Sequence, residues 1–209
     1  MDLNGDGMKD ILSGSDTGSI FIFYRRFDGS FKDREPVTDA SGNPIRMVVG
    51  GAVASAVDWD RDSDLDLLVG DSEGYVHFYA NESNGRALML QPAQKLTVGR
   101  SMIISRGMAA APHVVDWDDD GSHDLLVGNY DGAVRFYRNT SSTGMPRLSR
   151  PIELVSRQQR DFGRYSKVCT GDWNNDGHLD LIMGTLIGLE DKSDQHGYVW
   201  VFLRSDSSK

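Results

Sequence analysis

An acidic pattern of eleven residues occurs four times and constrains the fold of this 209-residue chain more than any other feature. It reads DLNGDGMKDIL, DWDRDSDLDLL, DWDDDGSHDLL and DWNNDGHLDLI, starting at Asp2, Asp58, Asp116 and Asp172. Successive starts are 56, 58 and 56 residues apart. A pattern with so constant a period indicates a repeat protein, in which each unit buries its apolar surface against its neighbours.

Each acidic segment precedes two predicted strands. A short apolar run closed by glycine (ILSGS, LLVGD, LLVGN, LIMGT) leads to an alternating β-branched and aromatic segment (GSIFIFYRR, GYVHFYANE, GAVRFYRNT, GYVWVFLRS). Glycine turns between the two segments are typical of β-hairpins. A third strand fits ASAVDWD, PHVVDWD and SKVCTGDW, and a weaker fourth fits REPVTDA, PAQKLTV and RPIELVS.

These strands predict an all-β fold, a β-propeller of about four four-stranded antiparallel blades with about 57 residues each, of which the first and last are incomplete. A β-sandwich is the competing architecture, but its strands occupy non-equivalent places. We expect a single domain over 1–209, with blade units near 1–50, 51–108, 109–164 and 165–209. The unpaired blade edges indicate a fragment of a larger propeller or an imperfectly closed four-bladed ring, and we rank self-association through these edges below both.

The charge and the ends of the chain limit its partners and location. The net charge of −9 disfavours nucleic acid and anionic lipid as partners. No stretch approaches 18 apolar residues, which predicts no membrane insertion, and the N-terminus lacks the features of a signal peptide. Because the chain starts inside the motif, we expect Met1 to mark a truncation and an export signal to lie outside this sequence. Cys169, which has no second cysteine to pair with, is expected to be a small buried residue.

The acidic pattern places oxygen-bearing side chains at its first, third, fifth and ninth positions. Alternate residues of a tight loop can converge on one point, and oxygen ligands without nitrogen or sulfur favour Ca²⁺ over zinc or copper. A backbone carbonyl at the seventh position would add a further ligand. The candidate ligands are Asp2, Asn4, Asp6, Met8 and Asp10; Asp58, Asp60, Asp62, Asp64 and Asp66; Asp116, Asp118, Asp120, Ser122 and Asp124; and Asp172, Asn174, Asp176, His178 and Asp180.

We therefore expect up to four Ca²⁺ ions, which together would nearly neutralise the chain. The second loop is expected to bind most weakly, because Ser63 replaces the glycine that eases the turn elsewhere. An EF-hand is excluded, since its twelfth position requires a bidentate glutamate. The chain has Ser13, Val69, Val127 and Met183 there.

The segments DLNGDGMKDILSGSDTG and DWNNDGHLDLIMG resemble the FG-GAP/VCBS repeats of integrin α-subunit propellers and of many bacterial secreted or surface proteins. The resemblance covers essentially the whole chain. It implies a calcium-stabilised propeller, extracellular or at the cell surface, whose acidic loops join the first two strands of each blade. The chain departs from the family at Ser63, in its tryptophans after the first aspartate, and in an insertion of nine residues within 185–197.

Other residues offer weaker functional signals. Trp59, Trp117 and Trp173 could stack on sugars, but their regular placement favours packing between blades. Asn81 and Asn139 match glycosylation acceptors, although a shared polar strand end is the simpler interpretation. The insertion is the preferred interaction site, because propellers commonly bind through non-equivalent loops, and a loop without a binding role is the equal alternative.

No catalytic motif is present, so the leading hypothesis is a non-enzymatic calcium-binding module for adhesion to an extracellular protein or glycan. The alternatives are a propeller-type carbohydrate-active enzyme, similar to a polysaccharide lyase, and a scaffold without a ligand of its own.

Overall fold

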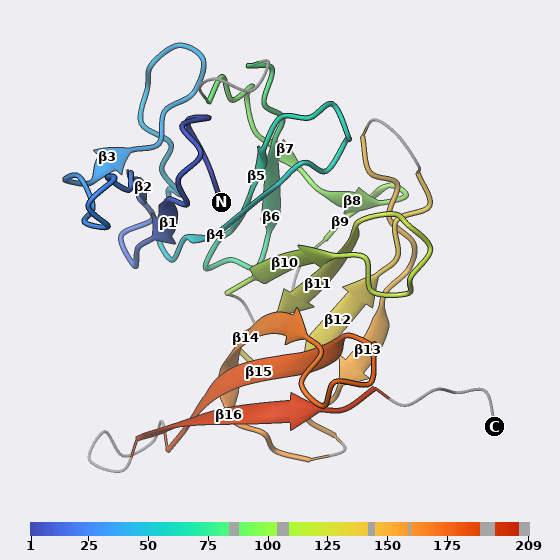
Figure 1. Cartoon of the computed structure of the whole chain (residues 1–209). Coiled ribbons are helices and arrows are strands. Elements are labelled where there is room, and N and C mark those ends of the chain that lie inside the picture. The colour runs from blue at the N-terminus through green and yellow to red at the C-terminus, as the bar shows by residue number, and fades with distance from the viewer. Residues whose placement is uncertain (84–87, 104–108, 142–144, 159, 189–194, 205–209) are drawn as a thin grey trace.

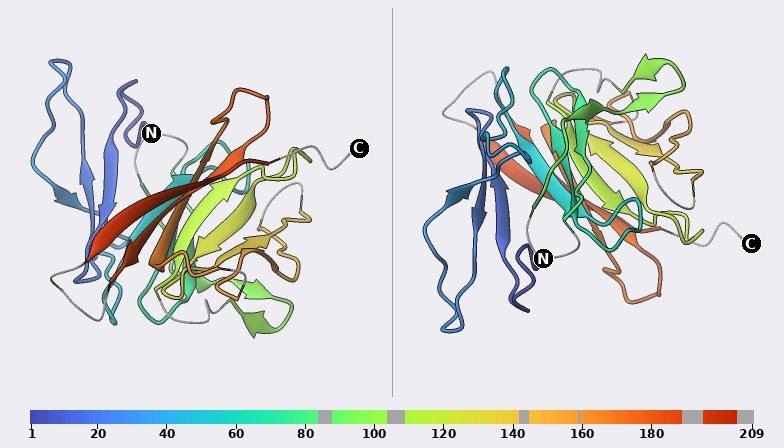
Figure 2. Two further views of the ribbon diagram at one scale, coloured as in Figure 1. Left: turned by 90° about the horizontal axis from the view of Figure 1, so that it is seen from below. Right: turned by 90° about the horizontal axis from the view of Figure 1, so that it is seen from above.

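The computed structural model describes residues 1–83, 88–103, 109–141, 145–158, 160–188 and 195–204. Throughout these ranges the regular secondary structure is antiparallel strand, without helix. The strands form sheets that lie beside one another in chain order, from the N-terminal sheet in blue to the C-terminal sheet in red (Figures 1 and 2). The predicted all-β propeller fold is confirmed.

Four sheets correspond to the repeats, and we refer to them as the first to fourth blades. The first blade has the order β1-β2-β3, with β1 (Ile11–Gly14), β2 (Ile20–Phe23) and β3 (Glu35–Pro36). The second has β4 (Val53–Val57), β5 (Asp66–Gly70), β6 (Val76–Tyr79) and β7 (Gln94–Lys95). The third has β10 (Ala111–Val115), β11 (Asp124–Gly128), β12 (Val134–Tyr137) and β13 (Ile152–Val155). The fourth has β14 (Arg164–Gly171), β15 (Asp180–Ile187) and β16 (His196–Phe202).

The first and fourth blades thus have three strands each in the described residues, as the sequence predicted. A separate pair, β8 (Thr97–Val98) and β9 (Ser101–Met102), lies between the second and third blades along the chain. The innermost strands lie next to one another in chain order: β4 contacts β10, and β10 contacts β14. In the second, third and fourth blades the acidic loop follows the innermost strand, where Val57 pairs with Asp66, Val115 with Asp124 and Gly171 with Asp180.

Successive side chains of the second strand of a blade point to opposite faces, and both sets contribute to the core. Leu67 and Val69 pack in a cluster with the first blade, whereas Leu68 packs in a cluster with the third. In the third blade, Leu126 turns in the same way toward Leu181 of the fourth. All five residues of β5 are buried, and so are all five of β11, because a blade lies on each side of them. Three apolar clusters thus hold the four blades together in series.

The glycine that closes the second strand permits close approach of the next blade. A Cβ added at Gly70 would collide with the backbone carbonyl of Ala110, and one at Gly128 with that of Ser166. At Gly184, the equivalent residue of the fourth blade, no atom lies within 4 Å of such a Cβ. The repeated glycine is therefore a contact between blades.

Cys169 is exposed, so the expectation of a buried cysteine was wrong. It occupies the place in β14 that His113 occupies in β10. His113 is covered because its Nε2 lies 3.1 Å from Thr170 Oγ1 of the fourth blade. Within the described residues, no blade covers the corresponding face of β14.

No helix in the described part of the chain has the length and apolar character needed to cross a membrane.

Candidate metal sites in the acidic loops

The four acidic loops comprise residues 2–10, 58–66, 116–124 and 172–180, and the aspartate at the ninth position anchors each of them. Asp66 is buried. Its Oδ2 accepts the backbone N–H of Trp59 at 3.0 Å, and its Oδ1 accepts that of Asn81 at 2.9 Å. The same pair of hydrogen bonds from backbone N–H groups joins Asp10 to Leu3 and Arg25, Asp124 to Trp117 and Asn139, and Asp180 to Trp173 and Arg204. Each ninth-position carboxylate therefore ties its loop to the end of the blade's hairpin.

Burial makes these anchoring carboxylates electrostatically costly. Loss of hydration raises the pKa of Asp66 to about 6, although the backbone N–H groups of Asn81 and Trp59 offset part of the effect. The pKa of Asp124 also rises to about 6 for the same reason, with Asp118 and Asp120 as smaller causes. A bound cation would favour the ionised form of both groups.

The first-position aspartates hold the turn by accepting backbone N–H groups. Asp116 accepts those of Asp120 at 3.1 Å and Gly121 at 2.9 Å. Asp172 accepts those of Asp176 at 3.0 Å and Gly177 at 2.9 Å. In the first loop these bonds lower the pKa of Asp2, the bond from Gly7 contributing most. The loops are therefore folded around their first carboxylate.

The second loop takes the same backbone shape without the glycine. Arg61 and Ser63 have φ angles of 66° and 77°, close to the 59° and 83° of Asp119 and Gly121 at the equivalent positions. A non-glycine residue in this left-handed region carries strain. The weaker binding expected of this loop stays a prediction, but its geometry is intact.

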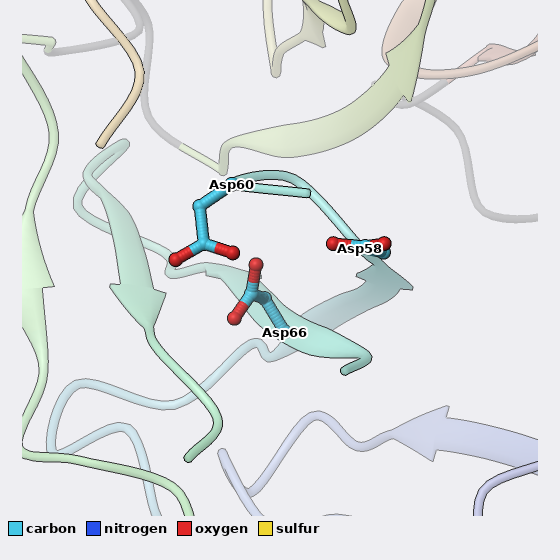
Figure 3. A group of neighbouring side chains, drawn as sticks. All are labelled: Asp58, Asp60 and Asp66. Carbon is cyan, nitrogen blue, oxygen red and sulfur yellow. The ribbon is translucent and has the colours of Figure 1, made fainter. Parts of the chain in front are cut away.

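Two groups of three carboxylates could hold a metal ion. Asp58, Asp60 and Asp66 in the second loop each place an oxygen within 4.8 Å of the others (Figure 3). Asp116, Asp118 and Asp120 do so in the third loop. Asp58 Oδ1 and Asp118 Oδ1 are buried oxygens without a hydrogen-bond partner. Unpaired, buried carboxylate oxygens facing others fit a hard divalent cation such as Ca²⁺.

The first and fourth loops are arranged differently. Their third position is asparagine, and its Nδ2 donates to the fifth-position carboxylate: Asn4 to Asp6 at 2.9 Å and Asn174 to Asp176 at 2.8 Å. The fourth loop is largely exposed, whereas the first is partly buried. Among the described residues, three carboxylates come together only in the second loop, without Asp62, and in the third loop, without Asp124.

The seventh-position residues, expected to offer carbonyl oxygens, contact the loops through their N–H groups. Met8, Asp64, Ser122 and His178 donate to the fifth-position Oδ1 at 2.8, 2.9, 2.8 and 2.9 Å. These bonds fix the fifth-position carboxylate, and in Asp176 the bond from His178 is the main cause of a lowered pKa. The ligand role of the carbonyls stays a prediction.

Two arginines that the sequence did not single out reach the third loop. Arg138 Nε lies 2.7 Å from Asp118 Oδ2, and its Nη2 lies 2.8 Å from Asp120 Oδ2. Arg204 of the fourth blade pairs with Asp119 at 3.0 Å and donates to the carbonyl of Trp117 at 2.5 Å. The carboxylate of Asp119 is thus paired with Arg204 and is not one of the candidate ligands. The available signal was an arginine within two residues of the end of the second hairpin strand, which is Tyr137 in β12 and Phe202 in β16.

The loop tryptophans confirm the packing interpretation in two of three cases. Trp59 is buried and donates its Nε1–H to the carbonyl of His123 in the third loop at 2.8 Å. Trp117 packs against the cluster between the third and fourth blades. Trp173 is 65% exposed.

The asparagines of both glycosylation motifs serve the fold. Asn81 is buried, with Nδ2 donating to the carbonyl of Leu65 at 3.1 Å and Oδ1 accepting the N–H of Met89 at 2.8 Å. Asn139 makes the equivalent bond to His123 at 3.1 Å. The interpretation as shared polar strand ends is therefore confirmed.

The insertion expected to bind a partner lies partly outside the described residues, which exclude 189–194. Its described parts extend the hairpin, where Ile187 pairs with His196 and Thr185 with Tyr198.

Repeated antiparallel blades with acidic loops after their innermost strands define this chain as a repeat β-propeller protein. The model of the FG-GAP-like repeat matches residues 2–69, 58–127 and 116–183, each match starting at the first aspartate of an acidic loop. The chain belongs to the FG-GAP-like repeat family.

The curated relatives include integrin α-subunits. The chain is 31% identical over 143 residues to integrin alpha-3 of Cricetulus griseus, covering 61% of this chain and 13% of the relative. It is 30% identical over 143 residues to integrin alpha-3 of Mus musculus, with the same coverage. It is 28% identical over 155 residues to integrin alpha-4 of Xenopus laevis, covering 64% of this chain and 14% of that protein. The chain thus spans only about an eighth of the length of these relatives.

Proposed function

We propose that this chain is a non-enzymatic β-propeller module for adhesion or ligand binding outside the cell, and that Ca²⁺ stabilises it at the acidic loops. The observation that carries the calcium part is the pair of buried, unpartnered oxygens, Asp58 Oδ1 and Asp118 Oδ1, each within a group of three carboxylates. Burying such oxygens without a partner is costly, and a divalent cation would remove that cost.

The ion would be held first by the second and third loops, where three carboxylates cluster, and then by the first and fourth loops. This order replaces the expectation from the sequence that the second loop binds most weakly. When bound, Ca²⁺ supplies positive charge and accepts several oxygen ligands in a flexible geometry. The ninth-position aspartates keep the loop in place against the hairpin, and the first-position aspartates shape the turn. Binding would therefore stabilise an existing fold, without a catalytic role.

The size of the effect follows from mass action. An extracellular site with a Kd of about 0.1 mM, in about 1 mM Ca²⁺, contributes about 1.4 kcal/mol to the free energy of unfolding. Two such sites contribute about 3 kcal/mol, which in a domain of this size corresponds to a rise in melting temperature of about 6–12 °C.

Differential scanning calorimetry of the chain in EDTA and in Ca²⁺ tests this part. We expect the rise in melting temperature to shrink by at least half in Asp58→Asn and by a smaller share in Asp118→Asn, because Asp118 Oδ2 already binds Arg138. Asp33→Asn is the matched control, because Asp33 is an exposed acid outside the loops whose replacement changes the charge equally. Identical melting curves with and without Ca²⁺ would refute the calcium assignment.

The adhesive part of the proposal is supported by the integrin α relatives and by the net charge of −9, which disfavours nucleic acid. We test it with surface-coated extracellular matrix proteins and a glycan array, in Ca²⁺. Saturable binding of one class supports the proposal, whereas a calcium-dependent fold without any ligand identifies a scaffold. Turnover of a polysaccharide in the same screen would instead identify an enzyme.

Self-association is part of the same proposal. The fourth blade exposes Trp173, Val199 and Leu203 at 65%, 72% and 57% of their surfaces. Apolar side chains so exposed on one blade favour contact with another chain or blade. Sedimentation velocity over a range of concentrations tests this, and Val199→Asp is expected to shift any oligomer toward monomer.

A further inference from the structure

Arg138 occupies a special place among the repeats, directly after the second hairpin strand of the third blade. The equivalent residues of the other blades are Tyr24, Ala80 and Leu203. Only the third repeat therefore has a cationic side chain at this position. From there the guanidinium reaches back to the acidic loop that precedes β11.

The contacts of Arg138 involve the carboxylates of the candidate metal group. Nε lies 2.7 Å from Asp118 Oδ2 and Nη2 lies 2.8 Å from Asp120 Oδ2. Both distances are those of short, charge-assisted hydrogen bonds. One side chain thus neutralises two of the three oxygen donors that a cation in this loop would use.

The second and third loops consequently differ in electrostatic state. In the third loop, the Arg138 guanidinium lies against Asp118 and Asp120. In the second loop, Ala80 occupies the equivalent position and brings no charge to Asp60 and Asp62. The residue after the second hairpin strand therefore compensates the carboxylates of the third loop and not those of the second.

The guanidinium of Arg138 does not satisfy every carboxylate oxygen of the third loop. Asp118 Oδ1 stays buried without a hydrogen-bond partner while Oδ2 binds the guanidinium. The Arg138 side chain is also 50% exposed, so that it can turn into solvent without crossing packed atoms. A divalent cation can therefore enter the third loop, provided that it displaces the guanidinium from Asp118 and Asp120.

We propose that Arg138 is a built-in counter-cation that competes with Ca²⁺ for the third loop, which makes this loop stable without metal and weaker in calcium affinity than its carboxylates alone would be. The inference rests on the proposed calcium binding. It gives the two clustered loops different roles: the second depends on calcium, whereas the third is held by the protein's own charge at low calcium.

The test is isothermal titration with Ca²⁺ on Arg138→Ala, which gives the third loop the residue that Ala80 provides in the second. We expect a gain of about tenfold in the affinity of one site, because Ca²⁺ then no longer has to displace a guanidinium paired with two carboxylates. Adding Asp116→Asn should abolish that high-affinity site and so assign it to the third loop. In EDTA, Arg138→Ala should melt at a lower temperature than the wild type.

Three further variants and one NMR signal test the competition more closely. Ala80→Arg should weaken the second site, whereas Arg135→Ala, which removes a neighbouring arginine paired with Glu153 at 2.9 Å, should leave calcium affinity unchanged. Arg138→Lys, which keeps the charge but loses the two-point contact, should fall between wild type and alanine. The Nε–H resonance of Arg138 should change in NMR spectra as the third loop fills.

The outcomes separate the two proposals. Calcium binding with no gain, or with a loss, at the third loop in Arg138→Ala overturns the competition while leaving the proposed calcium function in place. Absence of calcium binding in the wild type and in every variant overturns both.

Discussion

The second and fourth acidic loops share a sequence pattern but differ in their surroundings. Trp59 of the second loop is 2% exposed, because the third blade covers it, whereas Trp173 of the fourth loop is 65% exposed. The closing glycine differs in the same way, since Gly70 abuts Ala110 and Gly184 has open space. Each repeat therefore carries the apolar residues of an interface between blades. These residues are buried only where a following blade packs against them.

The largest effect expected from this comparison concerns the tryptophans. Trp59→Ala removes a buried indole, its bond to the carbonyl of His123 and its edge contact with Phe78, whose ring centroid lies 5.6 Å away. We expect a loss of about 3–5 kcal/mol in the free energy of unfolding. Trp173→Ala should cost less than about 0.5 kcal/mol. Equal losses in urea-induced unfolding would contradict the difference between the loops.

The glycines give the next effect. Gly70→Ala forces a methyl group against the Ala110 carbonyl and should cost at least about 2 kcal/mol through overpacking. Gly184→Ala, which changes the same strand position in the fourth blade, should be neutral. Thermal unfolding of both variants measures this, and a destabilised Gly184→Ala would mean that its face is covered.

A pH effect should distinguish the loops in calcium-free buffer. The folded pKa of Asp66 is about 6 against an ordinary value of 3.8, so the folded state binds more protons between these values. The stability contributed by protonated Asp66 is complete below pH 4 and is lost as the pH rises through 6, by about 2 kcal/mol. Asp176 has a lowered pKa, so its contribution is already complete above pH 4.

The measurement is the free energy of unfolding of wild type minus that of Asp66→Asn, from pH 4 to pH 7 in EDTA. We expect this difference to fall with rising pH, while the corresponding difference for Asp176→Asn stays flat. A constant Asp66 difference would show that its pKa is ordinary.

Calcium removal should give the smallest of these effects. Asp58→Asn should abolish about 1.4 kcal/mol of calcium-dependent stabilisation, since it replaces an unpartnered buried oxygen. Asp172→Asn should abolish less, because both oxygens of Asp172 already accept backbone N–H groups. Comparing each variant in EDTA and Ca²⁺ isolates the metal contribution, and a larger loss in Asp172→Asn would reverse the proposed order of the sites.

The spacing of Asp58, Asp60 and Asp66 was enough to predict an acidic loop between an innermost strand and an apolar one. This worked because side-chain type and period specify both the turn and the strand. The anchoring role of Asp66 could not be predicted, since its partners are backbone N–H groups that leave no trace in the residue types.

Contacts between blades were the other feature that could not be predicted from the sequence. Cys169 looked like a buried residue because its neighbours are apolar, but its burial depends on a neighbouring blade. The reach of Arg138 was equally hidden, because it depends on a register in which the end of β12 lies beside the loop before β11.

The bonds from each ninth-position aspartate to backbone N–H groups have a consequence for how such repeats diverge. The partners after the hairpin are Arg25, Asn81, Asn139 and Arg204, whose side chains differ in charge and size. Because the carboxylate recognises only the main chain, duplication followed by substitution can alter these side chains without loosening the loop. Asn81 turns its side chain inward to its own blade, while Arg204 extends to the preceding one. One invariant backbone contact thus leaves each copy free to acquire a different surface.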